Sequence, residues 1–213
     1  MDRLQKTLTT TLWAVVVVAM IAFVATQALR ARSRAGATSV MTASSDTPTQ
    51  KFEPLYDVPV FDLTDHNGQP ITNKQLLGNV WIADFIFTNC AGPCPLMTLK
   101  MSELQKSVNR PDVKLVSFTV DPERDTPDVL KEYGRRYDAV DSRWSFVTGK
   151  TDAMYNVARG MKIAAQAATD DQPIIHSDRF LLIDRKGHIV GYYRNEPDDL
   201  KRLTTDATEL AAK

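Results

Sequence analysis

The apolar run Val80–Phe87 is the stretch that most constrains how this chain can fold. Only Asp84 interrupts it. A short, continuous apolar run of this kind is typical of a strand that is buried on both faces, in a sheet with other layers packed on each side. Cys90 and Cys94 follow the run, and an amphipathic stretch begins at Pro95. The order of strand, cysteine loop and helix therefore predicts an α/β protein in which the cysteine loop lies at the end of a central strand.

The rest of the body continues to alternate strands and helices. Residues 113–120 are predicted to form a second strand, which makes a right-handed βαβ unit with the first strand and the helix between them. The elements predicted after it are a helix with Thr126 as N-cap and Pro127 as its first residue, ending near Tyr137, a strand at 144–148, a helix at 152–159, a hairpin of strands at 179–184 and 188–193, and a last helix opened by Pro197. Upstream, Asn67-Gly68 favours a hairpin turn between strands at 58–63 and 70–72. This element order predicts a thioredoxin-like fold with an added N-terminal hairpin.

The helix after the cysteine loop is predicted to begin at Pro95 and to end before Pro111. Its apolar face is predicted to consist of Leu96, Leu99, Leu104 and Val108. Met97 and Met101 also lie four residues apart. On an amphipathic helix that spacing is more typical of core packing than of extra thioether ligands for a metal.

The amino-terminal region is predicted to anchor the protein in a membrane. Residues 7–29 carry no charge, and a helix of this length spans the hydrocarbon core of a bilayer. A cleaved signal peptide would have a shorter apolar region with an A-x-A site directly after it, whereas the A-x-A at 35–37 lies beyond an arginine cluster. The chain is therefore divided into a short flank (1–6), one uncleaved transmembrane anchor (7–29), a flexible tether (30–51) and a folded domain (52–213). Bases flank both ends of the anchor, so the positive-inside rule does not favour export of the domain.

The charge distribution argues against a nucleic-acid partner. The first 34 residues hold five of the 26 bases and one of the 26 acids, which leaves a mildly acidic body. Binding to a phosphate backbone needs a basic stripe, and this body has none in its sequence. We therefore expect a small or weakly charged partner.

Cys90 and Cys94 are the only cysteines among the 213 residues. Cys90 is expected just beyond the carboxyl end of a strand, where open α/β sheets bind ligands, and Cys94 at the N-cap of the next helix. The helix dipole favours an anion there, so we expect Cys94 to ionise more readily than an ordinary thiol. Thiolates bind soft metals and attack disulfides, and a structural disulfide across so short a loop would remove little unfolded-state entropy. The spacing alone leaves a metal site, a redox pair and a structural disulfide open.

Three histidines are available to complete a metal site. A closed zinc site usually has four protein ligands, whereas two thiolates and one imidazole suit copper better. His66, in a polar turn, and His188, at the start of an edge-like strand, are predicted to be solvated surface residues. His176 follows an apolar stretch and precedes a core strand, where a loop would meet the active end of the sheet. On these residues alone, an ordinary loop histidine is the commoner interpretation of His176.

Three motifs are more specific together than any of them is alone. They are Phe87-Thr88-Asn89-Cys90-Ala91-Gly92-Pro93-Cys94-Pro95, Phe118-Thr119-Val120-Asp121-Pro122-Glu123-Arg124-Asp125-Thr126-Pro127, and Ile175-His176-Ser177. With these motifs the chain resembles the Sco (SenC/PrrC) family of membrane-tethered copper chaperones, which have a thioredoxin-like fold. The resemblance extends from Val58 to about Tyr193.

The resemblance implies that Cys90, Cys94 and His176 bind copper, as Cu(I), Cu(II) or both. It implies delivery of that copper to the dinuclear copper site of cytochrome c oxidase subunit II, with another copper chaperone as a candidate donor. It also implies a single-pass protein of the cell inner membrane with its domain in the periplasm, or in the mitochondrial intermembrane space of a eukaryote. Many members have an Asp between the cysteines and another just before the His, where this chain has Gly92 and Ile175.

Two hypotheses about the chemistry remain open at this stage. A metallochaperone would use the cysteines as metal ligands and need not be an enzyme. A thiol-disulfide oxidoreductase would instead use Cys90 and Cys94 as a redox pair on the cysteines of a partner. Asp84 is predicted to face the sheet edge. The alternative is that its carboxylate interacts with the metal ligands and orients them.

Overall fold

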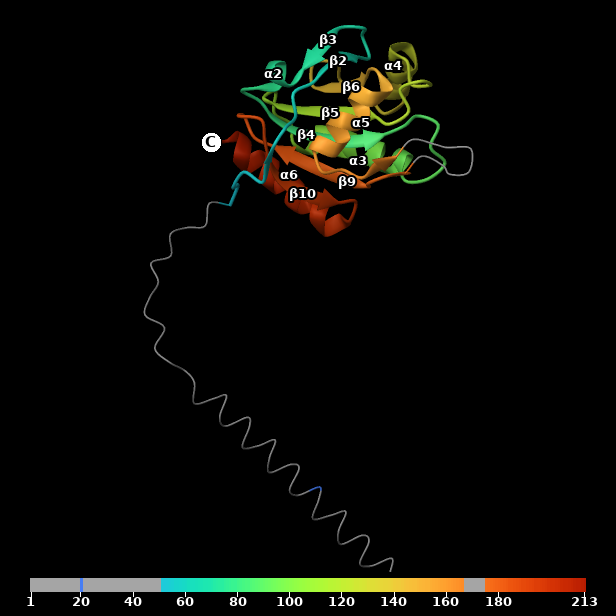
Figure 1. Cartoon of the computed structure of the whole chain (residues 1–213). Coiled ribbons are helices and arrows are strands. Elements are labelled where there is room, and N and C mark those ends of the chain that lie inside the picture. Colours follow the sequence, from blue (N-terminus) through green and yellow to red (C-terminus); the bar gives the residue numbers. More distant parts are fainter. Residues whose placement is uncertain (1–19, 21–50, 167–174) are drawn as a thin grey trace, which may run out of the picture. The chain divides into compact units, whose positions relative to one another are not determined.

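The computed structural model describes Met20, residues 51–166 and residues 175–213, with backbone only at Gln166, Ile175 and His176 (Figure 1). The chain divides into two units, 1–49 and 50–213, and the second contains the folded domain. Within the described residues no helix is both long and apolar enough to cross a membrane. The predicted flank (1–6), anchor (7–29) and tether (30–51) lie outside the described residues, apart from Met20 and Lys51.

An eight-stranded mixed sheet organises the domain, in the order β1-β10-β9-β4-β5-β6-β2-β3. Its strands are β1 (Tyr56–Asp57), β2 (Asp62–Asp65), β3 (Pro70–Thr72), β4 (Val80–Ile86), β5 (Val113–Thr119), β6 (Trp144–Thr148), β9 (Arg179–Ile183) and β10 (His188–Arg194). β4, β5 and β6 are parallel neighbours, whereas β9 runs antiparallel to β4 and β10 antiparallel to β9. The β2–β3 hairpin extends the sheet beyond β6. This arrangement confirms the predicted thioredoxin-like fold with an added N-terminal hairpin.

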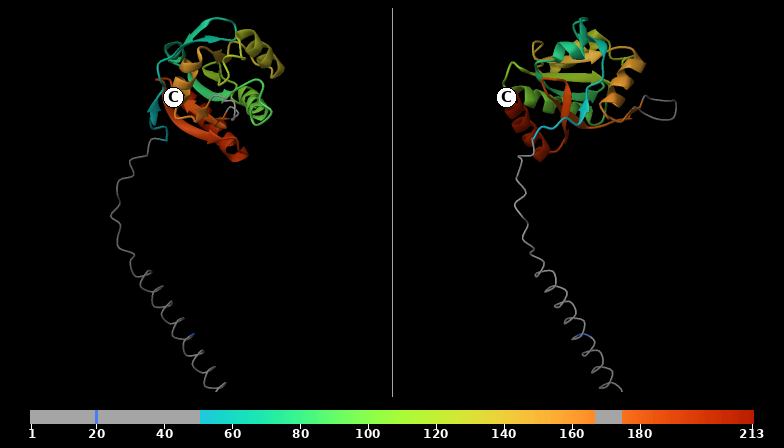
Figure 2. Two further views of the ribbon diagram at one scale, coloured as in Figure 1. Left: turned by 45° about the vertical axis from the view of Figure 1, so that its right-hand side comes forward. Right: turned by 60° about the vertical axis from the view of Figure 1, so that its left-hand side comes forward.

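Helices cover both faces of the sheet, as the two turned views in Figure 2 show. One core cluster packs α3 (Cys94–Ser107), α4 (Pro127–Arg136) and α6 (Pro197–Ala211) against one face. The other cluster includes α5 (Thr151–Gly160) and the four-residue α2 (Asn73–Leu76). A second, two-stranded sheet of β7 (Ala165–Gln166) and β8 (Ile175–His176) precedes β9.

β4 joins the two cores, because its side chains alternate between the two faces of the sheet. Val80, Ile82 and Ile86 belong to the cluster with α3, and Trp81, Ala83 and Phe85 belong to the cluster with α5. All seven residues of β4 are buried. Full burial of an aliphatic or aromatic side chain contributes roughly 1.5–3 kcal/mol, so this strand can hold both layers on the sheet.

Most of the predicted elements are confirmed. Residues with a strong local conformational preference mark where they begin or turn. Thr126 is the N-cap of α4, and its hydroxyl accepts a hydrogen bond from the Val129 amide at 3.4 Å. The β9–β10 and β2–β3 turns contain Gly187 and Gly68, whose φ angles of +85° and +74° favour glycine. The first hairpin strand begins at Asp62 and not at residue 58. The short elements β1, α2, β7 and β8 were not predicted.

α3 differs from the prediction in its start and in its buried face. It begins at Cys94, one residue earlier than predicted, with Pro93 as N-cap. Leu96 and Leu99 are 49% and 46% exposed, so the predicted apolar face was wrong for these two leucines. The buried face instead combines the core residues Met97, Met101 and Leu104 with the polar residues Thr98, Ser102 and Gln105.

Hydrogen bonds explain why polar residues lie on the buried face of α3. The Thr98 hydroxyl donates to the Cys94 carbonyl and lies 2.9 Å from the Tyr133 hydroxyl. The Gln105 amide group donates to the Asp138 carbonyl at 2.9 Å. A buried polar group with partners costs little, so the buried face cannot be found from apolar residues alone. The preference for core packing at Met97 and Met101 is confirmed, because both are 0% exposed.

Of the two histidines that were predicted to be solvated, the fold buries His66 and partly covers His188. His66 is 3% exposed, because the β2–β3 hairpin packs on β6, and its Nδ1 accepts a hydrogen bond from the Phe146 amide at 3.2 Å. The His188 side chain is 28% exposed, and its Nδ1 lies 3.0 Å from Asp184 Oδ2. β10 pairs with β1 on one side and with β9 on the other, so His188 is not on an edge strand. The surface prediction was therefore wrong for His66, whereas His188 remains partly exposed and only its placement on an edge strand was wrong.

Candidate metal and thiol site

The two cysteines lie at the carboxyl end of β4, on either side of the turn that leads into α3. Cys90 is half-buried and Cys94 is fully buried, and both are thiols. The Gly92 amide donates to Cys90 Sγ at 3.3 Å, and the Cys90 thiol lies close enough to Cys94 to raise the pKa of that thiol. The structure therefore brings two soft sulfur donors together where an α/β sheet binds its ligands.

Burial controls the protonation of Cys94. Removal of the thiol from water raises its pKa, and the hydrogen bond with Cys90 raises the pKa further. A backbone hydrogen bond from Phe87 opposes this rise. The expectation that Cys94 ionises readily was therefore wrong for the described state, because full burial outweighs the favourable field of the α3 N-terminus. The thiol proton of Cys94 must therefore be released when this pair binds a metal or is oxidised.

Asp84 is fully buried in β4, the strand that leads to the cysteine loop. It lies on β4 with β5 and β9 on its two sides, so the prediction that it faces the sheet edge was wrong. Neither carboxylate oxygen has a hydrogen-bond partner within normal distance and angle limits among the described residues. Burial raises the pKa of Asp84 to about 7, and Ser117, its neighbour on β5, partly opposes the rise. The charge of Asp84 also raises the pKa of Cys94.

The segment that contains His176 reaches the same end of the sheet. In β8, His176 pairs with Ala165 of β7, and the Ser177 amide donates to the Ala164 carbonyl at 2.9 Å. β9 begins three residues later and runs antiparallel to β4, with Leu181 opposite Ala83. The backbone before β9 therefore lies at the carboxyl end of β4, where the cysteine loop begins.

The imidazole of His176 lies outside the described side chains. Among the side chains that are described, no three His, Cys, Asp or Glu residues are grouped so as to hold a metal ion. The structure thus brings Cys90 and Cys94 together and carries the backbone of His176 to the same end of the sheet. Its role as a third ligand stays a prediction.

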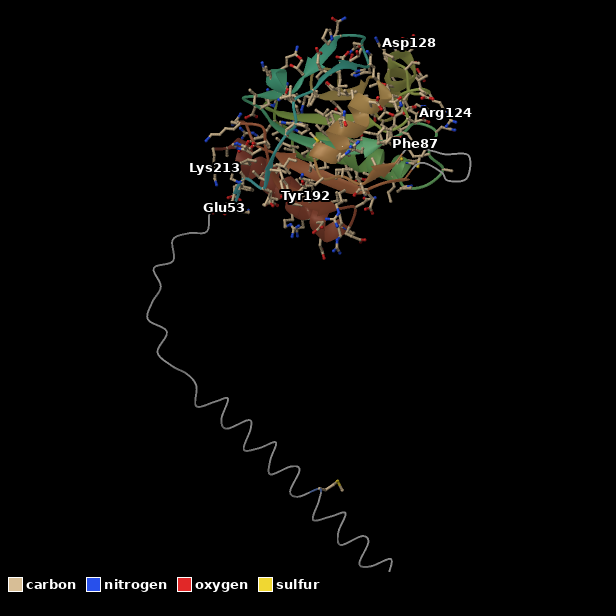
Figure 3. All side chains as sticks on the ribbon, in the orientation of Figure 1. Glu53, Phe87, Arg124, Asp128, Tyr192 and Lys213 are labelled. Atoms are coloured by element: carbon tan, nitrogen blue, oxygen red, sulfur yellow. The ribbon has the colours of Figure 1, made fainter. Side chains whose placement is uncertain are left out.

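Asp125 also lies in this region, and no role was predicted for it from the sequence. It is 0% exposed, and it accepts hydrogen bonds from Thr88, at the start of the cysteine loop, and from Thr119, at the end of β5. Figure 3 labels Phe87 and Arg124, which mark the two segments that Asp125 joins. The signal that could have found this contact is the pair of threonines, because each stands at the carboxyl end of one of two adjacent parallel strands.

Comparisons with known proteins identify the family of the chain. The family model described as SCO1/SenC matches residues 50–212. The SCO1 protein homolog of Bacillus subtilis (strain 168) is 34% identical over 155 residues, which cover 69% of this chain and 80% of the relative. BsSco, a member of the Sco family of cytochrome c oxidase assembly proteins with an identified disulfide switch, has a TM-score of 0.67 and 32% identity over 75% of this chain and 96% of its own. ScoI of Bradyrhizobium japonicum with copper bound has a TM-score of 0.62 and 26% identity over 73% of this chain and 99% of its own. Because the family model spans nearly the whole domain, the chain belongs to the SCO1/SenC family.

Proposed function

We propose that this protein is a copper metallochaperone in which Cys90, Cys94 and His176 bind one copper ion as cargo. The observation that carries this proposal is the pair of free thiols, Cys90 and Cys94, at the carboxyl end of β4. Sulfur ligands select Cu(I), and an imidazole accommodates both oxidation states of copper. The copper-bound relative and the family's place in cytochrome c oxidase assembly support the same function.

The acceptor in this proposal is the dinuclear copper site of cytochrome c oxidase subunit II, and the donor is another copper chaperone. Residues 7–29 anchor the protein in the inner membrane with the domain in the periplasm, or in the intermembrane space of a mitochondrion. The uncharged composition of residues 7–29 supports the anchor. A transfer assay with the copper-loaded protein and the soluble domain of subunit II tests the acceptor directly.

The role of His176 is tested by replacing it with Ala. We expect the affinity for Cu(II) to fall at least about tenfold, because a change at or next to a metal ligand commonly costs that much or more. Isothermal titration and competition with a chromophoric chelator measure the affinity of the reduced protein. His188→Ala is the matched control, since His188 opens β10 at the opposite end of the sheet from the cysteines. Equal stoichiometry and affinity in the His176→Ala and His188→Ala proteins would contradict the three-ligand site.

A thiol-disulfide oxidoreductase is the second candidate function. The observation that favours it is the same pair of free thiols, together with the disulfide switch identified in BsSco. Under this hypothesis, reduction of a partner disulfide survives His176→Ala and is lost in Cys90→Ser. A metallochaperone alone shows no such activity in either protein.

A further inference from the structure

Asp125 is a buried carboxylate that is not among the proposed copper ligands. It is 0% exposed, although its neighbours Arg124 and Thr126 are exposed. Its Oδ2 accepts a hydrogen bond from the Thr88 amide at 3.1 Å, and its Oδ1 accepts one from the Thr88 hydroxyl at 2.5 Å. The Thr119 hydroxyl also donates to Oδ2 at 2.5 Å. Hydrogen bonds to an ionised acceptor are shorter and roughly twice as strong as those between neutral groups.

These hydrogen bonds join three separate segments at one point. Thr88 follows β4 and precedes Cys90 by two residues, Thr119 ends β5, and Asp125 precedes the N-cap of α4. The Thr119 hydroxyl oxygen in turn accepts a hydrogen bond from the Asp121 amide at 2.9 Å. The first residues of the cysteine loop are therefore held to the neighbouring strand through the Asp125 side chain.

The two cysteines are held in place by different parts of the fold. Cys94 is the first residue of α3, and its carbonyl accepts the Thr98 hydroxyl at 2.9 Å, so the helix fixes its position. Cys90 lies in the loop, where Thr88 and its contact with Asp125 are the nearest hydrogen-bonded anchor on its amino-terminal side within the described residues. The distance between the two sulfur atoms consequently depends on the anchor at Thr88.

We propose that Asp125 is a positioning residue that sets the separation of the Cys90 and Cys94 sulfur atoms. By holding the loop on β5, it keeps the pair open for a bound metal and disfavours its closure into a disulfide. The effect on metal binding rests on the proposed copper function, whereas the effect on disulfide formation does not.

Closure of the pair is a two-electron oxidation. The Cys90 and Cys94 sulfur atoms form an S–S bond of about 2.05 Å, and the two thiols release two protons and two electrons. A disulfide such as oxidised glutathione accepts the electrons and is reduced to two thiols. A loop that is free to move toward α3 reaches this short distance more readily than a loop that is anchored on β5.

The test is Asp125→Asn in the whole chain, with Asp128→Asn as the matched control. The amide has nearly the shape of the carboxylate but lacks its charge and one acceptor oxygen. Asp128 is exposed in the first turn of α4, so the control removes the same charge three residues away from the buried anchor. We expect Asp125→Asn to favour the disulfide at least tenfold, which lowers the midpoint potential by about 30 mV. Equilibration in glutathione buffers and thiol counting measure this quantity.

Two further measurements separate positioning from a general loss of stability. The energy of the thiolate-to-Cu(II) charge-transfer band reports the geometry of the metal site in the folded protein, and we expect Asp125→Asn to shift it and to weaken Cu(I) binding roughly 10–100-fold. Thr88→Val keeps Asp125 and the Thr88 amide but removes one hydrogen bond, so it should give a smaller change in the same direction. Thr88→Val also serves as the test if Asp125→Asn does not fold.

The outcomes distinguish this inference from the proposed function. If Asp125→Asn and Thr88→Val both match Asp128→Asn in potential and in absorption, and differ from it only in melting temperature, Asp125 is merely structural and the inference is overturned. If the unmodified protein binds no copper but Asp125→Asn still shifts the potential, the copper function fails and the positioning role stands.

Discussion

Replacing Cys94 by Ser should lower the affinity for Cu(I) by more than about 100-fold, because loss of a ligand exceeds the 10–100-fold cost of losing a group that merely supports one. A serine hydroxyl is a harder donor and stays protonated at neutral pH, so it cannot replace a thiolate toward Cu(I). Cys94 is 0% exposed at the start of α3, and serine differs from it by one atom, so we expect the fold to be retained. Competition with a chromophoric Cu(I) chelator measures the affinity, and circular dichroism checks the fold.

Met97→Leu is the matched control for Cys94→Ser. Met97 lies three residues further along α3, is 0% exposed and carries the sulfur atom of a thioether. Exchange of Met for Leu conserves volume and usually costs less than about 1.5 kcal/mol of stability. We expect copper affinity and stoichiometry to be unchanged in this variant. If Met97→Leu loses copper and Cys94→Ser retains it, the thioether and not the buried thiol binds the metal.

The sequence predicts the elements of this domain well where a single residue marks their ends. Thr126 and Pro127 place the start of α4, and Gly187 places the β9–β10 turn, because each of these residues has a conformational preference that acts locally. β4 was predicted from its apolar run, which only Asp84 interrupts and which requires only that both faces be covered. The βαβ order then follows from the handedness of the crossover.

The failures of prediction share one physical cause, which is that burial depends on partners distant in the chain. His66 lies in a polar turn, yet the contact between its hairpin and β6 covers the ring. Leu96 and Leu99 are exposed because Thr98 and Gln105 have hydrogen-bond partners that let them face the core instead. No pattern of apolar residues along α3 contains this information.

Only part of the candidate site could be predicted from local features of the sequence. The position of Cys90 and Cys94 at the end of β4 follows from the local order of strand, loop and helix. The addition of His176 depended on a resemblance between motifs, since eighty-two residues separate it from Cys94 and no periodicity links the two. The protonation of Cys94 was predicted wrongly, because sequence shows its place at a helix N-terminus but not its burial.

Asp84→Asn should remove a pH-dependent loss of stability. The folded pKa of Asp84, about 7, lies above its ordinary value of 3.8. Below the ordinary value the carboxyl group is protonated in both states and costs nothing through ionisation. As the pH rises toward about 7, the unfolded chain loses the proton while the folded chain keeps it, so the free energy of unfolding falls. The total difference amounts to roughly 4 kcal/mol, and it is fully developed above about pH 7.

An amide at position 84 carries no charge at any of these pH values, so the stability difference between Asp84→Asn and the unmodified protein should itself depend on pH. The buried amide still needs partners, which costs about 1–3 kcal/mol, but this cost is the same at every pH and cancels when two pH values are compared. Urea unfolding of the reduced proteins at pH 4 and pH 8 should show the variant gaining several kcal/mol relative to the unmodified chain between the two. Asp128→Asn, at an exposed position, provides the baseline for losing a carboxylate. The prediction is contradicted if the stability difference between Asp84→Asn and the unmodified protein depends on pH no more than that of Asp128→Asn does. In that case the folded domain keeps Asp84 ionised, through a hydrogen bond from water or from another donor.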